Sequence, residues 1–168
     1  MQRRTWLKLG AVSATVLILA GGATALLPPG LQQGRLCPGA QDVFAGVARA
    51  MLDGTLPQER AAAQVALSSL IARIDALVQA LPPHAQAELS QLLGILSTGL
   101  GRRTLASLAP DWRSASVTEV QQALQSMRSS RLALRLQSYQ ALHDIVGAAY
   151  FSEAGTWPAL GYPGPLKI

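Results

Sequence analysis

Apolar residues recur every three to four positions along most of this chain, and that spacing constrains the fold more than any other feature. The clearest stripe comprises Leu67, Leu70, Ile71, Ile74, Leu77, Val78 and Leu81. Such spacing places apolar side chains on one face of a helix. The chain is also rich in alanine and leucine and poor in aromatic residues, at 5%, and this composition favours helices over strands. We therefore predict an all-α protein.

Glycine, proline and capping residues divide the periodic region into segments of helical length. Gly54 and Pro82 are stop signals, and Ser116 with Glu119 forms a capping box, which predicts a helix start. The expected helices cover residues 40–53, a segment from 55–58 to Pro82, a segment to about Thr98, a segment from Ser116, and roughly 130–151. About five helices with short links, and a short helical or irregular crossover before Pro110, predict a small bundle over 40–151.

Proline and glycine interrupt both flanks of this region. Residues 26–39 contain Pro28, Pro29 and Pro38 and are expected to form an extended linker. Residues 152–168 are expected to form an extended C-terminal tail, because helices and ladder strands do not tolerate that density of proline. Aromatic residues in such a preorganised backbone suit a contact surface. Alternatively the tail folds back over its own bundle, which composition favours by a small margin.

The first residues have the pattern of an export address. The proposed signal comprises Arg3, Arg4, Trp6, Leu7 and Lys8, which match a twin-arginine (Tat) motif. An uncharged stretch follows, and Ala23 and Ala25 form a small-x-small cleavage site, so residues 1–25 are predicted to be a signal peptide. A Sec-type signal and an uncleaved membrane anchor remain alternatives. All three place the body in the periplasm or on the periplasmic face of the inner membrane.

Residues typical of cofactor or metal sites are sparse. Cys37 is the single cysteine, expected as an ordinary unpaired thiol, and His84 and His143 belong to no metal-ligand spacing. His143 and Asp144 could resemble an acid/base pair, but adjacent helical positions point about 100° apart, so we expect a surface or partly buried histidine. We predict no enzyme activity and no cofactor in this chain.

The basic balance of the chain comes partly from the signal. The net charge of +5 includes three basic residues before the uncharged stretch, and their removal leaves 11 basic against 9 acidic residues, or +2. No basic run is interleaved with aromatic residues, so nucleic-acid binding is not expected. Arg128, Arg131 and Arg135 lie at steps of three and four on one helical face. They form either a solvated face or a basic stripe for an acidic partner or lipid headgroups.

Motifs at both ends resemble one known family. The C-terminal motifs are Tyr150-Phe151-Ser152-Glu153, Thr156-Trp157-Pro158-Ala159 and Leu160-Gly161-Tyr162-Pro163-Gly164-Pro165. They are similar to the C-terminal signature of the small (gamma) subunit of gluconate 2-dehydrogenase and related flavin dehydrogenases, with Phe151 where that family has a second tyrosine. That family also begins with a twin-arginine leader. Between the two ends, only a helical pattern is shared.

The resemblance implies a role without chemistry of its own. In such systems a large flavoprotein of the glucose-methanol-choline class holds FAD, and a cytochrome c subunit accepts the electrons. The small subunit resembles an escort that supplies the Tat signal for the flavoprotein and stabilises it. The expected partners are therefore the large subunit, the cytochrome c subunit, the Tat translocase and the inner membrane. The candidate docking residues are Tyr150, Trp157, Gly161, Tyr162 and Pro163.

A protein of a different class fits the same sequence. It is a stand-alone, membrane-anchored periplasmic helical protein that binds a small apolar ligand or scaffolds an envelope complex. The sequence leaves both hypotheses open, because neither motif names a ligand.

Overall fold

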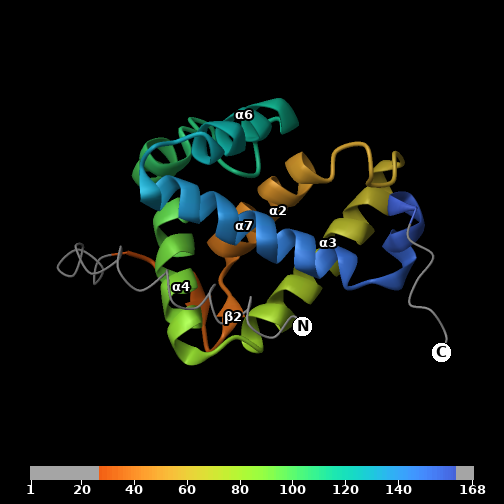
Figure 1. Cartoon of the computed structure of the whole chain (residues 1–168), viewed down its shortest axis with the longest axis horizontal. Helices are drawn as coiled ribbons and strands as arrows, with labels where there is room; N and C mark the ends of the chain where they lie inside the picture. The colour runs from red at the N-terminus through yellow and green to blue at the C-terminus, as the bar shows by residue number, and fades with distance from the viewer. Residues whose placement is uncertain (1–26, 162–168) are drawn as a thin grey trace.

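The computed structural model describes residues 27–161, and Figure 1 shows them as a bundle of helices. The export signal, the cleavage site at Ala23 and Ala25, and the tail residues Tyr162 and Pro163 lie outside the described residues. Within 27–161 the chain is mostly helical, which confirms the all-α prediction for this part of the protein.

The elements follow one another with short connections. Two short strands, β1 (Leu31–Gln32) and β2 (Arg35–Leu36), precede α2 (Pro38–Met51), α3 (Arg60–Gln79) and α4 (Pro83–Ser97). A single turn, α5 (Gly99–Gly101), and a π-helical turn, η4 (Arg102–Ala106), follow α4. The chain then forms α6 (Val117–Arg128), α7 (Ala133–Phe151) and a 3₁₀ helix, η5 (Ala154–Leu160). The five long helices correspond to the five predicted segments.

Helix α7 crosses the middle of the bundle and contacts α2, α3 and α6. Figure 1 shows its first turn beside the ends of α4 and α6, and its last turn lies beside the middle of α3, where Arg73 contacts Ala149. The core is centred on α2, whose Val43, Phe44 and Val47 have no exposed surface. Burial of side chains of this size stabilises the fold by roughly 1.5–3 kcal/mol each.

The predicted apolar stripe on α3 faces this core, and the residues at its edges are only partly buried. Leu67, Leu70, Ile74 and Val78 are buried, and Ile71, Leu77 and Leu81 at the edges of the stripe are half-buried. On the last long helix the same argument fails at one position, because Leu132 precedes α7 and is 64% exposed. The apolar period assigned Leu132 to a helix that in fact begins at Ala133.

Residues 27–37 do not form the extended linker that proline content predicts. β1 and β2 pair antiparallel as a hairpin, with Leu31 opposite Leu36. Gln33 and Gly34 connect the strands, and both have positive φ, of 52° and 76°. Two-residue hairpin turns require that geometry. Gln-Gly is a weaker turn signal than Asn-Gly, so the sequence did not reveal the hairpin.

Hydrogen bonds connect the hairpin to α3 and α4. The Leu36 N–H donates to Asp75 Oδ1 on α3 (2.8 Å), and the Leu36 side chain is 5% exposed. On the other side, the Gly30 N–H donates to the Ser90 carbonyl oxygen on α4 (3.1 Å), and the Leu31 N–H donates to Ser90 Oγ (3.0 Å). These contacts make residues 30–36 part of the bundle.

Side-chain carboxylates start two of the long helices. The predicted capping box at α6 is confirmed: Ser116 Oγ accepts from the Glu119 N–H (3.2 Å), and Glu119 Oε2 accepts from the Ser116 N–H (2.8 Å). For α3 the predicted start at 55–58 is wrong. The cap is Glu59, whose carboxylate accepts from the Ala61 and Ala62 N–H groups at 2.8 and 2.6 Å. These bonds lower the pKa of both Glu59 and Glu119.

The tail is also more ordered than its composition indicates. Residues 154–160 form the 3₁₀ helix η5, so the extended-tail prediction over 152–168 is wrong for the described part. A short 3₁₀ segment leaves several N–H groups unpaired, so a proline costs little there.

One helix of the described part, α3, is long and apolar enough to cross a membrane by length and composition alone. In this fold one side of it packs on α2 and α7 and the other side is exposed, with 22% of its most apolar window buried. Core helices of soluble proteins can have the same length and composition.

Candidate functional site

Arg73 joins the middle of α3 to the end of α7. Its Nε donates to the Ala149 carbonyl oxygen (3.0 Å), and its Nη1 forms an ion pair with Glu153 Oε2 (2.5 Å). The carbonyl groups of a helix's last turn lack intrahelical donors, and that end of the helix dipole attracts a cation. Arg73 therefore fixes the place where α7 ends. No sequence pattern reveals this contact, because its partners are 76 residues apart.

The segment that follows α7 folds back onto the last turn of that helix, and we call residues 150–161 the C-terminal cap. Thr156 Oγ1 donates to the carbonyl oxygens of Tyr150 (3.1 Å) and Glu153 (2.7 Å). Trp157 Nε1 donates to the Phe151 carbonyl oxygen (2.9 Å). These donors satisfy carbonyl groups that the end of a helix leaves free. Gly161 then turns the chain with a φ of +69°, a conformation that glycine adopts without strain.

The aromatic rings of the cap have different environments. The rings of Tyr150 and Phe151 meet edge to face with centroids 5.1 Å apart. Tyr150 is partly buried against the core, and Trp157 is half-buried. Phe151 is 41% exposed. The exposed ring of the cap is therefore Phe151, which sequence reasoning did not select.

The structure thus brings together three of the five candidate docking residues. Tyr150, Trp157 and Gly161 belong to the C-terminal cap, where the first two help to build it. Tyr162 and Pro163 lie outside the described residues. A pattern of aromatic, proline and glycine residues identified the segment but not which ring is at the surface, because that depends on the last turn of α7.

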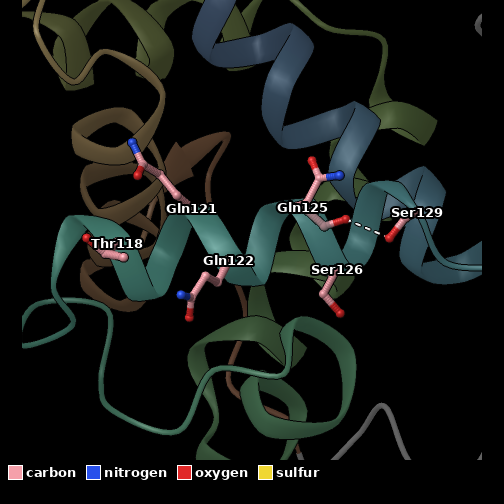
Figure 2. Close-up of a pocket in the computed structure, with 6 residues that line it drawn as sticks. All are labelled: Thr118, Gln121, Gln122, Gln125, Ser126 and Ser129. Atoms are coloured by element: carbon pink, nitrogen blue, oxygen red, sulfur yellow. Dashed lines mark hydrogen bonds between the residues drawn. The ribbon is translucent and has the colours of Figure 1, made fainter.

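A shallow, open groove runs along the outer side of α6, as Figure 2 shows. It is lined by Thr118, Gln121, Gln122, Gln125, Ser126 and Ser129. All six side chains are uncharged, so the lining itself supplies no base to activate a hydroxyl nucleophile. Three of its side chains have structural bonds. Gln121 Nε2 donates to the Ala50 carbonyl oxygen (3.1 Å), Ser129 Oγ donates to the Gln125 carbonyl oxygen (2.9 Å), and Ser126 Oγ accepts from Arg135 Nη2 (2.8 Å).

Arg102 is the buried charged side chain of the described residues, at 5% exposure. Its Nη2 lies 2.8 Å from Asp111 Oδ1 and 3.3 Å from the Ala109 carbonyl oxygen. Its Nε has no hydrogen-bond partner within the described part of the chain. The pair holds the crossover between η4 and α6 in place, and Trp112 Nε1 adds a bond to the Leu96 carbonyl oxygen (2.8 Å).

His84 and His143 lie at the surface, and a surface position was expected for His143. His143 Nδ1 is 3.1 Å from Asp144 Oδ1, so side-chain rotation overcomes the angular separation of adjacent positions. Both members of this pair are exposed. Cys37 is a free thiol directly before α2. Among residues 27–161, no three His, Cys, Asp or Glu side chains are placed to hold a metal ion together.

Comparisons of the chain with protein-family models, with curated proteins and with solved structures found no match in any of the three. The class that the structure defines is a mostly helical bundle with an ordered C-terminal cap. Its function is argued from its own residues.

Proposed function

We propose that this chain is a non-catalytic accessory subunit of a periplasmic FAD-dependent dehydrogenase. It supplies a twin-arginine export signal for the flavoprotein and stabilises it. The observation that supports the proposal most is that the residues of the C-terminal resemblance, from Tyr150 to Gly161, fold as one cap pinned by Arg73. A motif that builds a fixed surface unit is what a docking role requires, because a rigid unit loses little entropy on binding.

The cap and α3 each carry an exposed apolar side chain. Phe151 is exposed at the end of α7, and Val65 is 66% exposed on α3, about two turns before Arg73. Apolar side chains at the surface of neighbouring elements are typical of protein interfaces. We assign the flavoprotein contact to this side, with Phe151 as its centre.

The first described residues lie away from the proposed docking surface. Residues 28–30 lie against α4, whereas the cap lies at the far end of α7 (Figure 1). A helix of 19 residues is about 28 Å long. A translocase can therefore hold the leader while the cap holds a folded partner. Tat export carries folded proteins, so FAD would already be bound in the partner.

The test is export of the flavoprotein encoded beside this chain. With both expressed, we expect the tagged flavoprotein to bring down this chain and to reach the periplasm with its FAD. Replacing Arg3 and Arg4 by lysine should leave both proteins in the cytoplasm, whereas the control Lys8→Arg should not. If the flavoprotein reaches the periplasm when this chain is deleted, the escort role is wrong.

A second experiment locates the contact. Phe151→Ser should weaken the association by about tenfold or more, since loss of an interface aromatic commonly costs over 1 kcal/mol. The matched control is Leu132→Ser, which removes an exposed apolar side chain at the other end of α7. Equal loss in both variants would contradict docking through the cap.

A further inference from the structure

We propose that the folded body makes a second contact, with an anionic phospholipid bilayer, through the end of the bundle opposite the cap. This basic end consists of α5, η4, the last turn of α6 and the residues that lead into α7. Its elements meet in space: Arg135 Nη2 on α7 donates to Ser107 Oγ (2.9 Å) and to Ser126 Oγ on α6 (2.8 Å). The proposal does not rest on the escort role.

Charge is divided unevenly between residues 102–135, which run from η4 through the crossover and α6 into α7, and the rest of the described chain. Residues 102–135 hold six arginines against two carboxylates, a net charge of +4. The remaining described residues, 27–101 and 136–161, hold four arginines against seven carboxylates, a net charge of −3. The total charge of the chain conceals this polarity. A molecule with such polarity turns its positive end toward an anionic surface.

Besides Arg135, which is bonded to two serines, three arginines of the basic end have no carboxylate partner among the described residues. Arg103, Arg128 and Arg131 are exposed, and no ion pair involves them within 27–161. By contrast Arg73, Arg102 and Arg113 each have an acidic partner. These exposed, unpaired guanidinium groups are free to bind phosphate, for which their fork of donors is suited. Arg35 and Arg60 are also exposed without an ion pair within 27–161, but they belong to β2 and to the start of α3.

The start of α7 adds a local conflict that an anion would relieve. Among the long helices, α3 and α6 have side-chain caps, and α2 and α4 begin with a proline. α7 has neither: Leu132 occupies its cap position without a side-chain bond, and Arg131 and Arg135 flank that position. Cations at a helix N-terminus oppose the helix dipole. Sequences break such local rules mainly at functional sites.

Two exposed leucines distinguish a bilayer from other anionic partners. Leu100 is 76% exposed on α5, and Leu132 is 64% exposed before α7. Leucine among arginines is the composition of segments that insert apolar side chains beneath phosphate headgroups. Nucleic acid would favour aromatic or polar side chains in these positions instead.

The point where the chain reaches the folded body lies on the same side. A Cβ atom at Gly94 would overlap the Pro28 carbonyl oxygen, so residue 28 lies directly against α4. Gly94 lies in the last turn of α4, and Gly101 of α5 lies directly against the neighbouring Ile95. Figure 1 shows this start beside α4, on the side where α7 begins. A leader in the membrane and the basic end can therefore engage one bilayer together.

A position-specific probe separates this contact from insertion of the leader. In the full-length chain with Cys37→Ser, an environment-sensitive dye is attached at Leu132→Cys or, as a control, at Val65→Cys. The two positions are matched at 64% and 66% exposure. We expect the emission at 132 to shift to the blue with vesicles of phosphatidylglycerol and phosphatidylcholine but not with phosphatidylcholine alone. The probe at 65 should be unchanged in both.

Salt and charge variants complete the test. About 0.5 M NaCl should reverse the shift at 132, because screening shortens the range of the attraction to a few ångströms. Arg128→Gln with Arg131→Gln should weaken the response tenfold to about thirtyfold. Arg35→Gln with Arg60→Gln removes the same charge elsewhere and should not. The salt titration needs no charge variant, so it decides the question even if one pair fails to fold.

Three outcomes would overturn the proposal. They are a silent probe at 132, an equal shift at both positions, and a shift that needs no anionic lipid. A probe that ignores vesicles but responds to the flavoprotein would assign the basic end to an acidic protein surface instead. That result would leave the escort role standing.

Discussion

The two ends of α7 are built on opposite plans. At the C-terminal end, Arg73, Thr156 and Trp157 donate to the last carbonyl groups, so the chain satisfies this end itself. At the N-terminal end, Leu132 caps nothing, and Arg131 and Arg135 lie close to the positive pole of the helix. One end is complete within the chain, and the other has unneutralised charge.

This difference gives the C-terminal end of α7 a structural role and its N-terminal end a role in binding. Satisfied polar groups rigidify a surface, which suits a protein contact of fixed shape such as the proposed one at Phe151. Unpaired cations beside exposed leucines lower the stability of the folded protein. Binding of an external anion would restore that stability. The comparison therefore predicts that substitutions at the first end will lower stability and that substitutions at the second can raise it.

The largest expected effect concerns the scaffold of the basic end. A Cβ atom at Gly101 would overlap the Ile95 carbonyl oxygen, whereas one at Gly99 would meet nothing within 4 Å. Gly101→Ala should therefore lower the free energy of unfolding by about 1–3 kcal/mol. Gly99→Ala should be neutral or slightly stabilising. Urea unfolding measures both, and equal effects would show that the α4–α5 junction is not closely packed.

The next effect concerns the completed end. Arg73→Ala removes a bond to the Ala149 carbonyl oxygen and the ion pair with Glu153, which is half exposed. We expect a loss of about 1–2 kcal/mol, mostly from the buried carbonyl contact, since exposed ion pairs contribute little. Amide exchange should speed up in residues 150–157. Arg60→Ala, at an exposed position with no ion pair within 27–161, is the control. Unchanged exchange in the cap would mean that Trp157 and Thr156 hold it alone.

Much of the bundle was predictable because local signals agree with the packing. The stripe from Leu67 to Val78 lies in the core, and the Ser116–Glu119 capping box starts α6 as expected. Both features depend on residues within one or two turns of each other. The hairpin at Gln33–Gly34 was missed because its positive φ values come with a weak turn sequence and are stabilised by α3 and α4.

The candidate sites were less predictable for the same reason. Composition pointed to the segment around Trp157, but its 3₁₀ form depends on donors to the end of α7 and on Arg73, far away in sequence. The i, i+3 and i+4 spacing singled out Arg128, Arg131 and Arg135, but the single helical face that it predicts for them is wrong. Arg128 ends α6, Arg131 lies in the connection and Arg135 belongs to α7. The spacing could not show that η4 lies beside them with Arg103, or that Arg135 is tied to two serines.

A smaller effect, of opposite sign, is expected at the open end. Leu132 has φ −80° and ψ 115°, the extended geometry of a cap residue. Leu132→Ser supplies the missing acceptor and should raise the free energy of unfolding by about 0.5–1 kcal/mol. The same change removes an apolar contact with the bilayer, so vesicle binding should weaken. Thermal unfolding and vesicle sedimentation test the pair of results. A variant that is less stable would show that Leu132 packs more than its exposure indicates.

The smallest effect tests whether the capped helices differ from α7 in their response to acid. Hydrogen bonds from Ser116 hold the pKa of Glu119 below its ordinary value of 4.5. A lowered folded-state pKa means that the carboxylate stabilises α6 above about pH 4.5, and that this contribution is lost as the pH falls through the folded-state value. Glu119→Gln keeps a hydrogen-bonding cap without the titration, so its urea midpoint should fall less between pH 6 and pH 3.5.

Glu59→Gln should act likewise at α3, where the Ala61 and Ala62 N–H groups lower the pKa of Glu59. The start of α7 has no carboxylate to lose, so Leu132→Ser should leave the acid loss unchanged. If all three variants lose stability with acid as the parent does, the carboxylate caps contribute nothing that distinguishes these helix starts.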